Sequence, residues 1–481
     1  MKIFQKKKSF LKDNLLTILT VVGVFGGVIL GISLRSSTDP WSKRHIMYLE
    51  FPGKIFLRML KMLIVPLLVS SVVSAVGSLD LSLSKKIAFR SIGYYAVTTV
   101  LAVTLGIILV VTIRPGAGLS EKFGNETSQV QSVRNVLTQD TLMDLIRNLF
   151  PPNLIQATFA QYQTVLVAPP KDDSDPEKEI PLTDYTITNR YENTTNVLGL
   201  VVFAIILGVA LGMMKEKGKT LLNFFQSTSE AMMVITRWVI WFSPVGVFFL
   251  VAAQVLETKS FAGLVEKLGL YFMTVLIGLL VHCFITLSIL YFLVTRKLPF
   301  KVLGGLSQVL VTAFGTASSS ATMPLTIQTL DDMGIDPRVT RFVIPVGSTI
   351  NMDGTALYEA VAAIFIAQFR KVPYSFGQLI AVSITATFAS IGAAGIPQAG
   401  LVTMVMVLDT VGLPSSDISY ILAVDWLLDR FRTTINVIGD SLGSCIVDSL
   451  SKNELSKMDD IDRLNADPHE LVEIAKADSH V

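Results

Sequence analysis

The chain has 481 residues, of which 51% are hydrophobic and 16% charged, and its formal net charge is +2. With a mean hydropathy of +0.57, it carries too little charge to solvate the roughly three soluble domains that its length would otherwise suggest. The near-neutral balance excludes a basic nucleic-acid binder and an acidic solvating protein, so the composition predicts a protein embedded in a bilayer. Cys283 and Cys445 both lie in apolar stretches and are expected to be buried free thiols.

Six runs without Asp, Glu, Lys or Arg are long enough to cross a membrane once, because a hydrocarbon core about 30 Å thick needs about 20 apolar residues per helix. They are residues 14 to 34, 62 to 79, 91 to 113, 193 to 214, 238 to 256 and 268 to 295. The first run follows several lysines, as a secretory signal does. It is too long for a signal's apolar region and no cleavage site follows, so we expect it to remain as a helix.

The distribution of basic residues predicts which loops are cytoplasmic. Lysine and arginine occur near the N-terminus and then in the alternate segments 85 to 90, 215 to 219 and 296 to 301, which places the N-terminus inside. The basic segment 35 to 61 disagrees with this tally. The polar segment 114 to 192 would lie outside, and it carries a glycosylation sequon at Asn125, with a second starting at Asn193.

Two later charge-free runs are too long and too interrupted to be single helices. Residues 302 to 330 centre on a small polar patch at 315 to 324, and residues 372 to 408 centre on a glycine-rich stretch at 390 to 400. Each is predicted to be a re-entrant hairpin, because non-helical backbone at membrane depth occurs only where protein or a water-filled cavity covers its polar groups. A glycine-rich helix contact surface is the alternative.

Each interrupted run is followed by a helix that carries carboxylates, and the offsets agree. Ser319 and Ser390 are 71 residues apart, and Asp353 and Asp425 are 72 residues apart. The pattern indicates two units of inverted topology. Paired interrupted segments in corresponding positions mark the substrate site of secondary transporters.

The last predicted crossing, residues 418 to 447, carries an unusual set of ionisable side chains. At about 100° per residue, its polar residues share an arc of about 100°, and aliphatic residues occupy the other side. Because each charge near the membrane centre costs at least ~2.5 to 3.5 kcal/mol, this stripe is predicted to face a binding cavity; an ion-pair network is the alternative. The stripe consists of Asp425, Asp429, Arg432, Thr433, Asn436 and Asp440.

The side chains of the stripe indicate what it binds. The planar fork of Arg432 matches a carboxylate with two parallel hydrogen bonds, and Asp429 can accept from an ammonium group. This combination predicts an acidic amino acid whose backbone ammonium meets Asp429 and whose side-chain carboxylate meets Arg432. Asp440 and Asn436 supply hard oxygen ligands of the kind that a small cation needs.

The preceding helix contains the sequence Asn-Met-Asp-Gly-Thr at residues 351 to 355. Local unwinding at Gly354 is expected to expose backbone carbonyls and to turn Asp353 toward a cation. Glu359 is expected to be helical and buried, where loss of solvent penalises a charged carboxylate. It is therefore a candidate proton carrier, with a salt-bridged acid as the alternative.

Three motifs, at residues 351 to 355, 394 to 400 and 429 to 440, resemble those of the animal excitatory amino acid transporters. The likeness covers nearly all of residues 10 to 450. It implies an all-α membrane protein with eight transmembrane helices and two re-entrant helical hairpins, in inverted repeats that move as an elevator. The implied division is a scaffold at 14–85 and 193–260, a transport domain at 86–113 and 261–450, an extracellular loop at 114–192, and cytoplasmic tails at 1–13 and 451–481; within the transport domain, the hairpins are 302–330 and 372–408 and the helices after them 340–369 and 418–447.

The same resemblance implies sodium-driven, proton-coupled, potassium-countertransporting uptake of glutamate and aspartate across the plasma membrane. It also implies a homotrimer, an anion conductance, and no cofactor beyond the coupling ions. Glu359 matches the proton-carrying glutamate, while Ala317 departs from the serine run of many members. The implied substrate residues are Ser318, Ser319, Thr355, Gly395, Asp429, Arg432, Thr433 and Asn436. The implied sodium residues fall into three groups, which are Asn351, Asn436 and Asp440; Tyr95, Thr98, Thr99, Asn351 and Asp353; and carbonyls near Thr349, Ser390 and Ile391, with Gly347 as a further ligand.

Three other functions can be weighed on the residues. A neutral amino acid exchanger would leave Arg432 buried and unpaired. An intramembrane aspartyl protease or a zincin lacks its signature here: Asp440 does not follow a Gly-x-Gly sequence, and no histidine belongs to an HExxH motif. A ligand-gated anion channel stays open as an alternative. The polar tail from 451 to 481 is predicted to be disordered, and its last residues, Ser479 to Val481, fit a PDZ-domain ligand.

Overall fold

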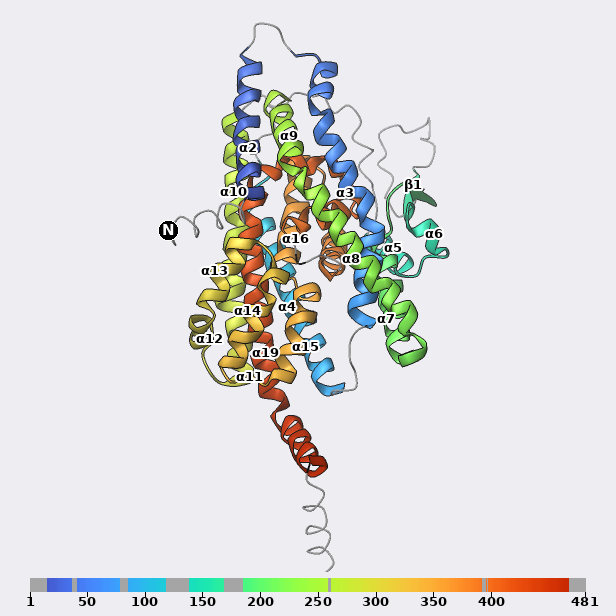
Figure 1. Cartoon of the computed structure of the whole chain (residues 1–481). Helices are drawn as coiled ribbons and strands as arrows, with labels where there is room; N and C mark the ends of the chain where they lie inside the picture. Colours follow the sequence, from blue (N-terminus) through green and yellow to red (C-terminus); the bar gives the residue numbers. More distant parts are fainter. Residues whose placement is uncertain are drawn as a thin grey trace, which may run out of the picture.

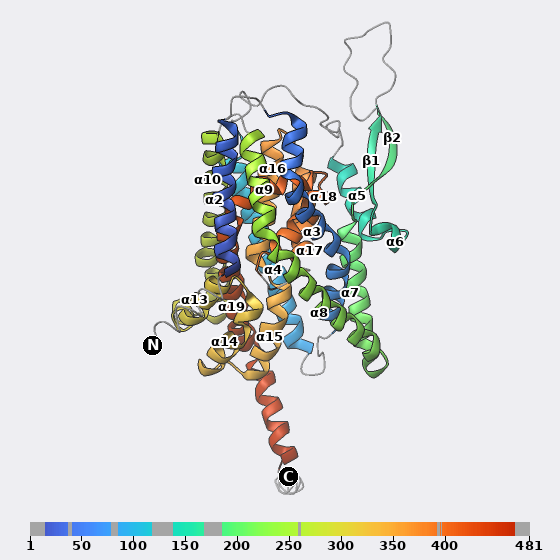
Figure 2. The same ribbon diagram turned by 45° about the horizontal axis from the view of Figure 1, so that its top comes forward.

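The computed structural model describes residues 15–36, 41–77, 85–117, 138–167, 185–257, 261–391, 395 and 397–466. In these residues the chain is a bundle of mostly apolar helices, which confirms the predicted helical membrane class (Figure 1). One small element beside the bundle is not helical. Strands β1 (Gln161–Val167) and β2 (Thr186–Glu192) pair antiparallel within the polar segment 114 to 192 and stand to one side of the bundle (Figure 2).

The first half of the chain forms long helices and, beside the bundle, the short helices and the hairpin of residues 138 to 192. Within it, two helices run further than their charge-free cores. The run predicted at 62 to 79 belongs to a helix that begins at Lys43, and the run at 238 to 256 belongs to a pair bent by 47° that begins at Lys219. The elements are α2 (Leu15–Arg35), α3 (Lys43–Gly77), α4 (Lys85–Ile113), α5 (Thr138–Leu149), α6 (Leu154–Ala157), α7 (Val197–Met214), η2 (Lys215–Lys217), α8 (Lys219–Trp241) and α9 (Ser243–Glu257).

Helix α3 explains the segment that disagreed with the tally of basic loops. Residues 43 to 61 are helical, and two of their lysines pair with acids: Lys54 Nζ lies 2.6 Å from Glu50 Oε2, and Lys61 Nζ lies 3.1 Å from Asp409 Oδ2. Part of the positive charge in segment 35 to 61 is therefore neutralised within the fold.

The second half breaks both interrupted runs into shorter helices, which meet in pairs at the stretches 315 to 324 and 390 to 400 predicted from their small residues. Whether these pairs are re-entrant in a membrane is part of the proposal below. The elements are α10 (Phe261–Val281), η3 (His282–Leu287), α11 (Ser288–Thr295), α12 (Phe300–Gly305), α13 (Ser307–Thr316), α14 (Ser319–Asp332), α15 (Pro337–Ile350), α16 (Asp353–Phe369), α17 (Phe376–Ile391), α18 (Ala399–Thr410), η4 (Ser415–Tyr420) and α19 (Leu422–Ala466).

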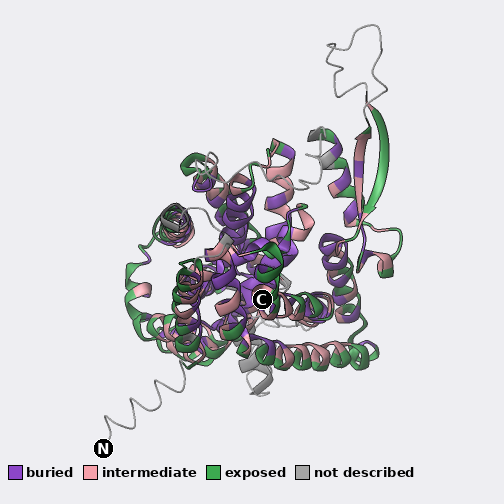
Figure 3. Cartoon of the chain, turned by 90° about the horizontal axis from the view of Figure 1, so that it is seen from above, coloured by how far each residue is buried: buried purple, intermediate pink, exposed green. Residues whose placement is uncertain are grey.

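Among the described residues, six helical spans are long and apolar enough to cross a membrane, and the bent pair α8–α9 makes a seventh. Helix α19, the expected eighth crossing, is not one of them, and it carries the stripe of ionisable residues. Viewed from above, the buried residues gather at the centre of the bundle, and exposed ones occupy its rim (Figure 3). At that centre every residue of α16 from Asp353 to Ala367 is buried.

Helix α19 continues past its expected end at residue 447 and projects below the bundle (Figure 1). The prediction of disorder from 451 was therefore wrong as far as Ala466, and residues 467 to 481, with the PDZ-like end, lie outside the described residues. Glu454 secures the extension, because its carboxylate lies 3.1 Å from Arg90 Nη1 and 3.0 Å from Lys86 Nζ on α4. Hydrogen bonds from Arg90 and then Lys86 lower the pKa of Glu454 to about 2.

Candidate functional site

The tips of the two interrupted segments touch each other near the middle of the bundle. Helices α13 and α14 meet at Ala317, whose φ of 49° is left-handed, and Ser318 then caps α14 by accepting from Ala321 N–H at 3.2 Å. Ser318 Oγ and the Ser320 N–H both donate to the Gly395 carbonyl, at 2.6 and 3.2 Å. A Cβ on Gly395 would collide with the Ser320 hydroxyl, so glycine allows this close approach.

Helices α15 and α16 are separated by a break at Asn351 and Met352, neither of which is helical. The break was expected at Gly354, but it falls before Asp353, which begins the first turn of α16. Gly354 has a different use. Its N–H donates to Asn436 Oδ1 at 2.8 Å, and a Cβ there would lie 2.9 Å from the Arg432 carbonyl oxygen. Glycine is needed for α16 to approach α19, rather than for unwinding.

Arg432 is held at the centre of the site and is 1% exposed. Its Nη2 lies 2.9 Å from Asp429 Oδ1 and 3.1 Å from Asp425 Oδ1, and its Cζ lies 3.8 Å above the ring centroid of Tyr358. The Asp429 pairing that we considered as a purely structural alternative is therefore present. It satisfies only part of the guanidinium, because Nε and Nη1 have no hydrogen-bond partner among the described residues.

A small cavity lies beside these groups and is lined by six of the eight residues predicted to bind substrate. Its volume is about 20 Å³, which is close to the space of a single water molecule. Asp429 Oδ2 accepts from Gln398 N–H at 2.8 Å, and Asn436 Nδ2 donates to Thr355 Oγ1 at 3.3 Å. The lining residues are Ala317, Ser319, Met352, Thr355, Gly395, Ala399, Gly400, Asp429, Thr433 and Asn436.

The two remaining predicted substrate residues lie at the edge of this cavity. Arg432 sits behind Gly400, where a Cβ would be 2.7 Å from its Nη1. Ser318 belongs to the hairpin contact described above. The structure thus brings all eight residues together, and their binding of substrate stays a prediction.

Oxygen-bearing side chains gather around Asp353 and Asn351. Thr99 Oγ1 and Thr98 Oγ1 donate to Asp353 Oδ1 at 2.8 and 3.2 Å, and Thr98 Oγ1 also lies 3.1 Å from Asn351 Oδ1. Asn351 Nδ2 donates to Asp440 Oδ1 at 3.0 Å, which joins the first two predicted sodium groups into one buried cluster. Among the described residues, no three His, Cys, Asp or Glu side chains converge as a metal site; this cluster combines the Asp353 and Asp440 carboxylates with amide and hydroxyl oxygens.

The other predicted cation ligands are less closely joined. Tyr95 donates to the Val343 carbonyl at 2.8 Å, and a Cβ on Gly347 would lie 3.2 Å from the Tyr95 hydroxyl. The hydroxyls of Thr349 and Ser390 each donate within their own helix, to the carbonyls of Val346 and Thr387. The third group was predicted to act through backbone carbonyls near Thr349, Ser390 and Ile391, and it stays a prediction.

Glu359 and the two sequons have distinct surroundings. Glu359 is 0% exposed, and neither of its carboxylate oxygens has a hydrogen-bond partner among the described residues. Asn193 is exposed immediately after β2, which is compatible with modification. Asn125 lies outside the described residues.

Three contacts of the site were not anticipated from the sequence. His282 is fully buried in the π-helical turn η3, with Nε2 3.2 Å from Asp353 Oδ2. Arg430 Nη1 binds the carbonyls of Phe314 and Gly315 at 2.6 and 2.7 Å, and so holds the C-terminal end of α13. A lone histidine in an otherwise apolar run was a usable signal for the first contact. Nothing in the sequence indicated the partners of Arg430 or the position of Tyr358 under Arg432.

Comparison with known proteins places this geometry in context. The family model described as the sodium:dicarboxylate symporter family matches residues 16–450. The chain is 47% identical over 472 residues to excitatory amino acid transporter 1 of Ambystoma tigrinum, covering 94% of this chain and 86% of the relative. It is 47% identical over 468 residues to human excitatory amino acid transporter 3, covering 94% and 88%. It is 46% identical over 488 residues to rat excitatory amino acid transporter 2, covering 98% and 84%.

Proposed function

The chain belongs to the sodium:dicarboxylate symporter family, and from this membership we propose that it is a transporter that uses a sodium gradient to take up L-glutamate and L-aspartate. The names of its relatives, all excitatory amino acid transporters, support the amino acid class. The described residues of the motifs that resemble theirs lie in the site at the contact of α16, α19 and the two interrupted segments.

The observation that carries the proposal is the incompletely paired guanidinium of Arg432. A buried donor without a partner costs about 1–3 kcal/mol, and more when it is charged. A side-chain carboxylate of the substrate would accept from the free Nε and Nη1 donors, while Asp429 would accept from the substrate ammonium. A neutral substrate would leave these donors unpaired, so the same observation favours an acidic amino acid over the substrate of a neutral exchanger.

Sodium coupling is proposed to act through the cluster around Asn351 and Asp353. Asn351 contacts both Thr98 and Asp440, and the Gly354 N–H contacts Asn436, which in turn donates to Thr355. A cation that orders this cluster would therefore also order Thr355 and Asn436 beside the substrate cavity. Such shared residues give the two ligands a favourable coupling free energy, which is reciprocal.

Substrate entry is proposed to require movement of the tip between α17 and α18. A cavity of about 20 Å³ cannot hold an amino acid. Opening at the second tip would break its hydrogen bonds from Ser318 and Ser320 to Gly395 and from Gln398 to Asp429. Breaking three hydrogen bonds costs about 0.5–1.5 kcal/mol each, which the free energy of substrate binding can offset.

The larger architecture is part of the same proposal. Eight crossings would include α19, both interrupted segments would be re-entrant, and the domain 86–113 with 261–450 would move as an elevator against the scaffold 14–85 with 193–260. We further propose a homotrimer in the plasma membrane with cytoplasmic termini, proton and potassium coupling, and an anion conductance. Chemical cross-linking of the purified chain should yield a trimer; a monomer alone would contradict this assembly. Deletion of Val481 should reduce surface clustering if a PDZ-domain protein binds the C-terminus.

Uptake of labelled glutamate into cells that express the chain tests the function directly. We expect accumulation above control cells in sodium medium and none after sodium is replaced by choline. Simultaneous current recording separates the transporter from a ligand-gated anion channel. Glutamate-gated current without accumulation would favour the channel and reject the proposal.

A further inference from the structure

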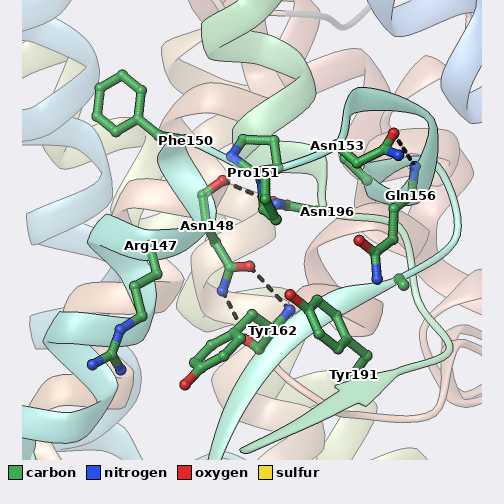
Figure 4. Close-up of a pocket in the computed structure, with 12 residues that line it drawn as sticks. Arg147, Asn148, Phe150, Pro151, Asn153, Gln156, Tyr162, Tyr191 and Asn196 are labelled. Carbon is green, nitrogen blue, oxygen red and sulfur yellow. Dashed lines mark hydrogen bonds between the residues drawn. The ribbon is translucent and has the colours of Figure 1, made fainter.

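A second cavity of about 260 Å³ lies outside the bundle, between α5, α6, the β1–β2 hairpin and the start of α7 (Figure 4). It is thus about thirteen times larger than the cavity beside Arg432, and it is near the lower end of the range of roughly 300–1,000 Å³ in which proteins hold small ligands. None of the transport residues lines it. Its walls combine the tyrosines of both strands, Tyr162 and Tyr191, with Pro151, Gln156 and Asn196.

The walls suit a ring that is apolar on its faces and bears hydroxyl groups. The rings of Tyr162 and Tyr191 meet edge to face with centroids 5.8 Å apart. Neither tyrosine hydroxyl, nor the side-chain amide of Gln156, has a hydrogen-bond partner among the described residues. These groups provide an aromatic surface and free polar atoms around one small space, the usual composition of ligand pockets.

The charge at the rim does not favour an anion. Arg147 lies with Cζ 5.3 Å from the Tyr162 ring centroid, and its Nη1 pairs with Asp144 Oδ1 at 3.2 Å. Because Asp144 offsets the guanidinium charge, the pocket is better suited to a neutral polar molecule than to a free carboxylate or phosphate.

A covalent source of such a molecule is adjacent in the chain. The sequon Asn193-Thr194-Thr195 begins two residues after Tyr191 and three residues before Asn196, both of which line the cavity. Two residues span at most about 7 Å, and the Asn193 side chain is exposed. A sugar attached to Asn193 would therefore start beside the pocket opening, at a high effective concentration.

We propose that this cavity is a carbohydrate subsite, which receives the first sugar residues of an N-linked glycan on Asn193. The tyrosine rings and Pro151 pack against the faces of the sugar, and Gln156 and the tyrosine hydroxyls bind its hydroxyl and acetamide groups. The glycan thereby joins β2 to α6 and to the end of α5. The inference rests on the proposed topology, in which segment 114 to 192 lies outside.

Glycan release from the folded full-length chain tests the inference. The first measurement is glycopeptide mass spectrometry, in which Asn193 must be modified. The second is the rate at which an amidase releases this glycan from the native protein. Tyr191→Ala should raise the rate severalfold, and Ile187→Ala, an exposed residue of the same strand outside the cavity, should not. Gln156→Ala serves the same purpose if Tyr191→Ala does not fold.

A thermal-stability cycle provides the complementary readout. The loss of stability caused by Tyr191→Ala should be larger in the glycosylated chain than in an Asn193→Gln background. An unmodified Asn193, equal release rates for all variants, or strictly additive stability effects would each overturn the inference. Sodium-dependent uptake is recorded in parallel. Normal uptake with an unmodified Asn193 would remove the carbohydrate subsite alone, and absent uptake with a protected glycan would remove only the transport proposal.

Discussion

Helix α2 and the α15–α16 segment are both apolar enough to cross a membrane, yet they use this property in opposite ways. In the apolar part of α2, 28% of residues are buried, whereas in Pro337–Phe369 the share is 94%. Helix α2 presents Val22, Phe25 and Ile29 outward, all more than 60% exposed. The α15–α16 segment instead contains the carboxylates of Asp353 and Glu359, which are buried in the protein interior. Hydropathy alone does not distinguish a helix with an exposed apolar surface from a buried helix that holds charged side chains. The positions of the charged residues in the sequence make this distinction.

Close packing at glycines, rather than contacts between polar groups, holds helix α2 against its neighbour. Gly23, Gly27 and Gly31 recur every fourth residue and face α9 closely enough that added Cβ atoms would meet its backbone. This is the small-residue packing by which helices associate where lipid already satisfies apolar surfaces. The stability of the fold should therefore be sensitive to larger side chains on the face of α2 that contacts α9, and should tolerate substitutions on the opposite face.

The largest expected effect comes from breaking that contact. A Cβ on Gly27 would lie 2.5 Å from the Phe248 carbonyl oxygen, so Gly27→Val should destabilise the fold by at least about 1–3 kcal/mol and remove most folded protein. Size-exclusion chromatography of the detergent-solubilised chain measures the loss. Phe25→Ala, on the exposed face, is the matched control and should behave as wild type. Equal profiles for both variants would refute this division of α2.

The buried polar cluster around Asp353 should be sensitive to the loss of a charge rather than to a change in side-chain volume. Asp353→Asn keeps the volume but removes the carboxylate that meets Thr98, Thr99 and His282. By analogy with the loss of other ion-binding contacts, the sodium concentration for half-maximal uptake should rise by about 10–100-fold. Asp332→Asn, at an exposed acid of α14, is the control. A sodium dependence unchanged by Asp353→Asn would exclude this cluster as a coupling site.

A smaller, more specific effect is expected at Glu359. Glu359→Gln preserves the shape of a side chain that is 0% exposed but cannot release a proton. We expect glutamate exchange to be retained and proton uptake to disappear. Intracellular pH recorded during net uptake measures this difference, and continued acidification in the variant would assign the proton to another group.

The smallest effect is expected at the extension of α19 beyond residue 447. Glu454→Gln should raise amide hydrogen exchange in residues 452 to 462 severalfold and leave uptake nearly unchanged. Because Arg90 and Lys86 lower the pKa of Glu454 from 4.5 to about 2, the contact is complete above the ordinary pKa and is lost as the pH falls toward 2. Exchange that is equally slow in the variant at neutral pH would show that other contacts hold the extension.

The sequence predicted those parts of the site in which a single segment contains residues that are energetically unfavourable in a membrane. Charges on α19 and small polar residues in the interrupted runs are expensive in a membrane, so their presence indicated a cavity and two helix breaks. The contact of Arg432 with Asp429, three residues away, was also visible because of helical spacing.

The parts that were missed depend on residues distant in the chain. His282 and Asp353 are brought together from 71 residues apart. No local signal predicts that the helix breaks at Asn351, because Gly354 instead serves the close contact of α16 with α19. The β1–β2 hairpin was overlooked because its strands are mixed in polarity, as in Gln161–Val167. The helix beyond residue 447 is polar, and contacts with α4 hold it.

Uptake by an Arg432→Cys variant is the most direct test of the central claim that a buried guanidinium selects an acidic amino acid. Labelled glutamate, aspartate and serine are offered to cells with equal surface amounts of wild type and variant. Removal of the partner for the side-chain carboxylate should reduce glutamate and aspartate uptake by at least about 100-fold and should admit serine, with sodium dependence retained. Glutamate uptake equal to that of wild type would contradict the account.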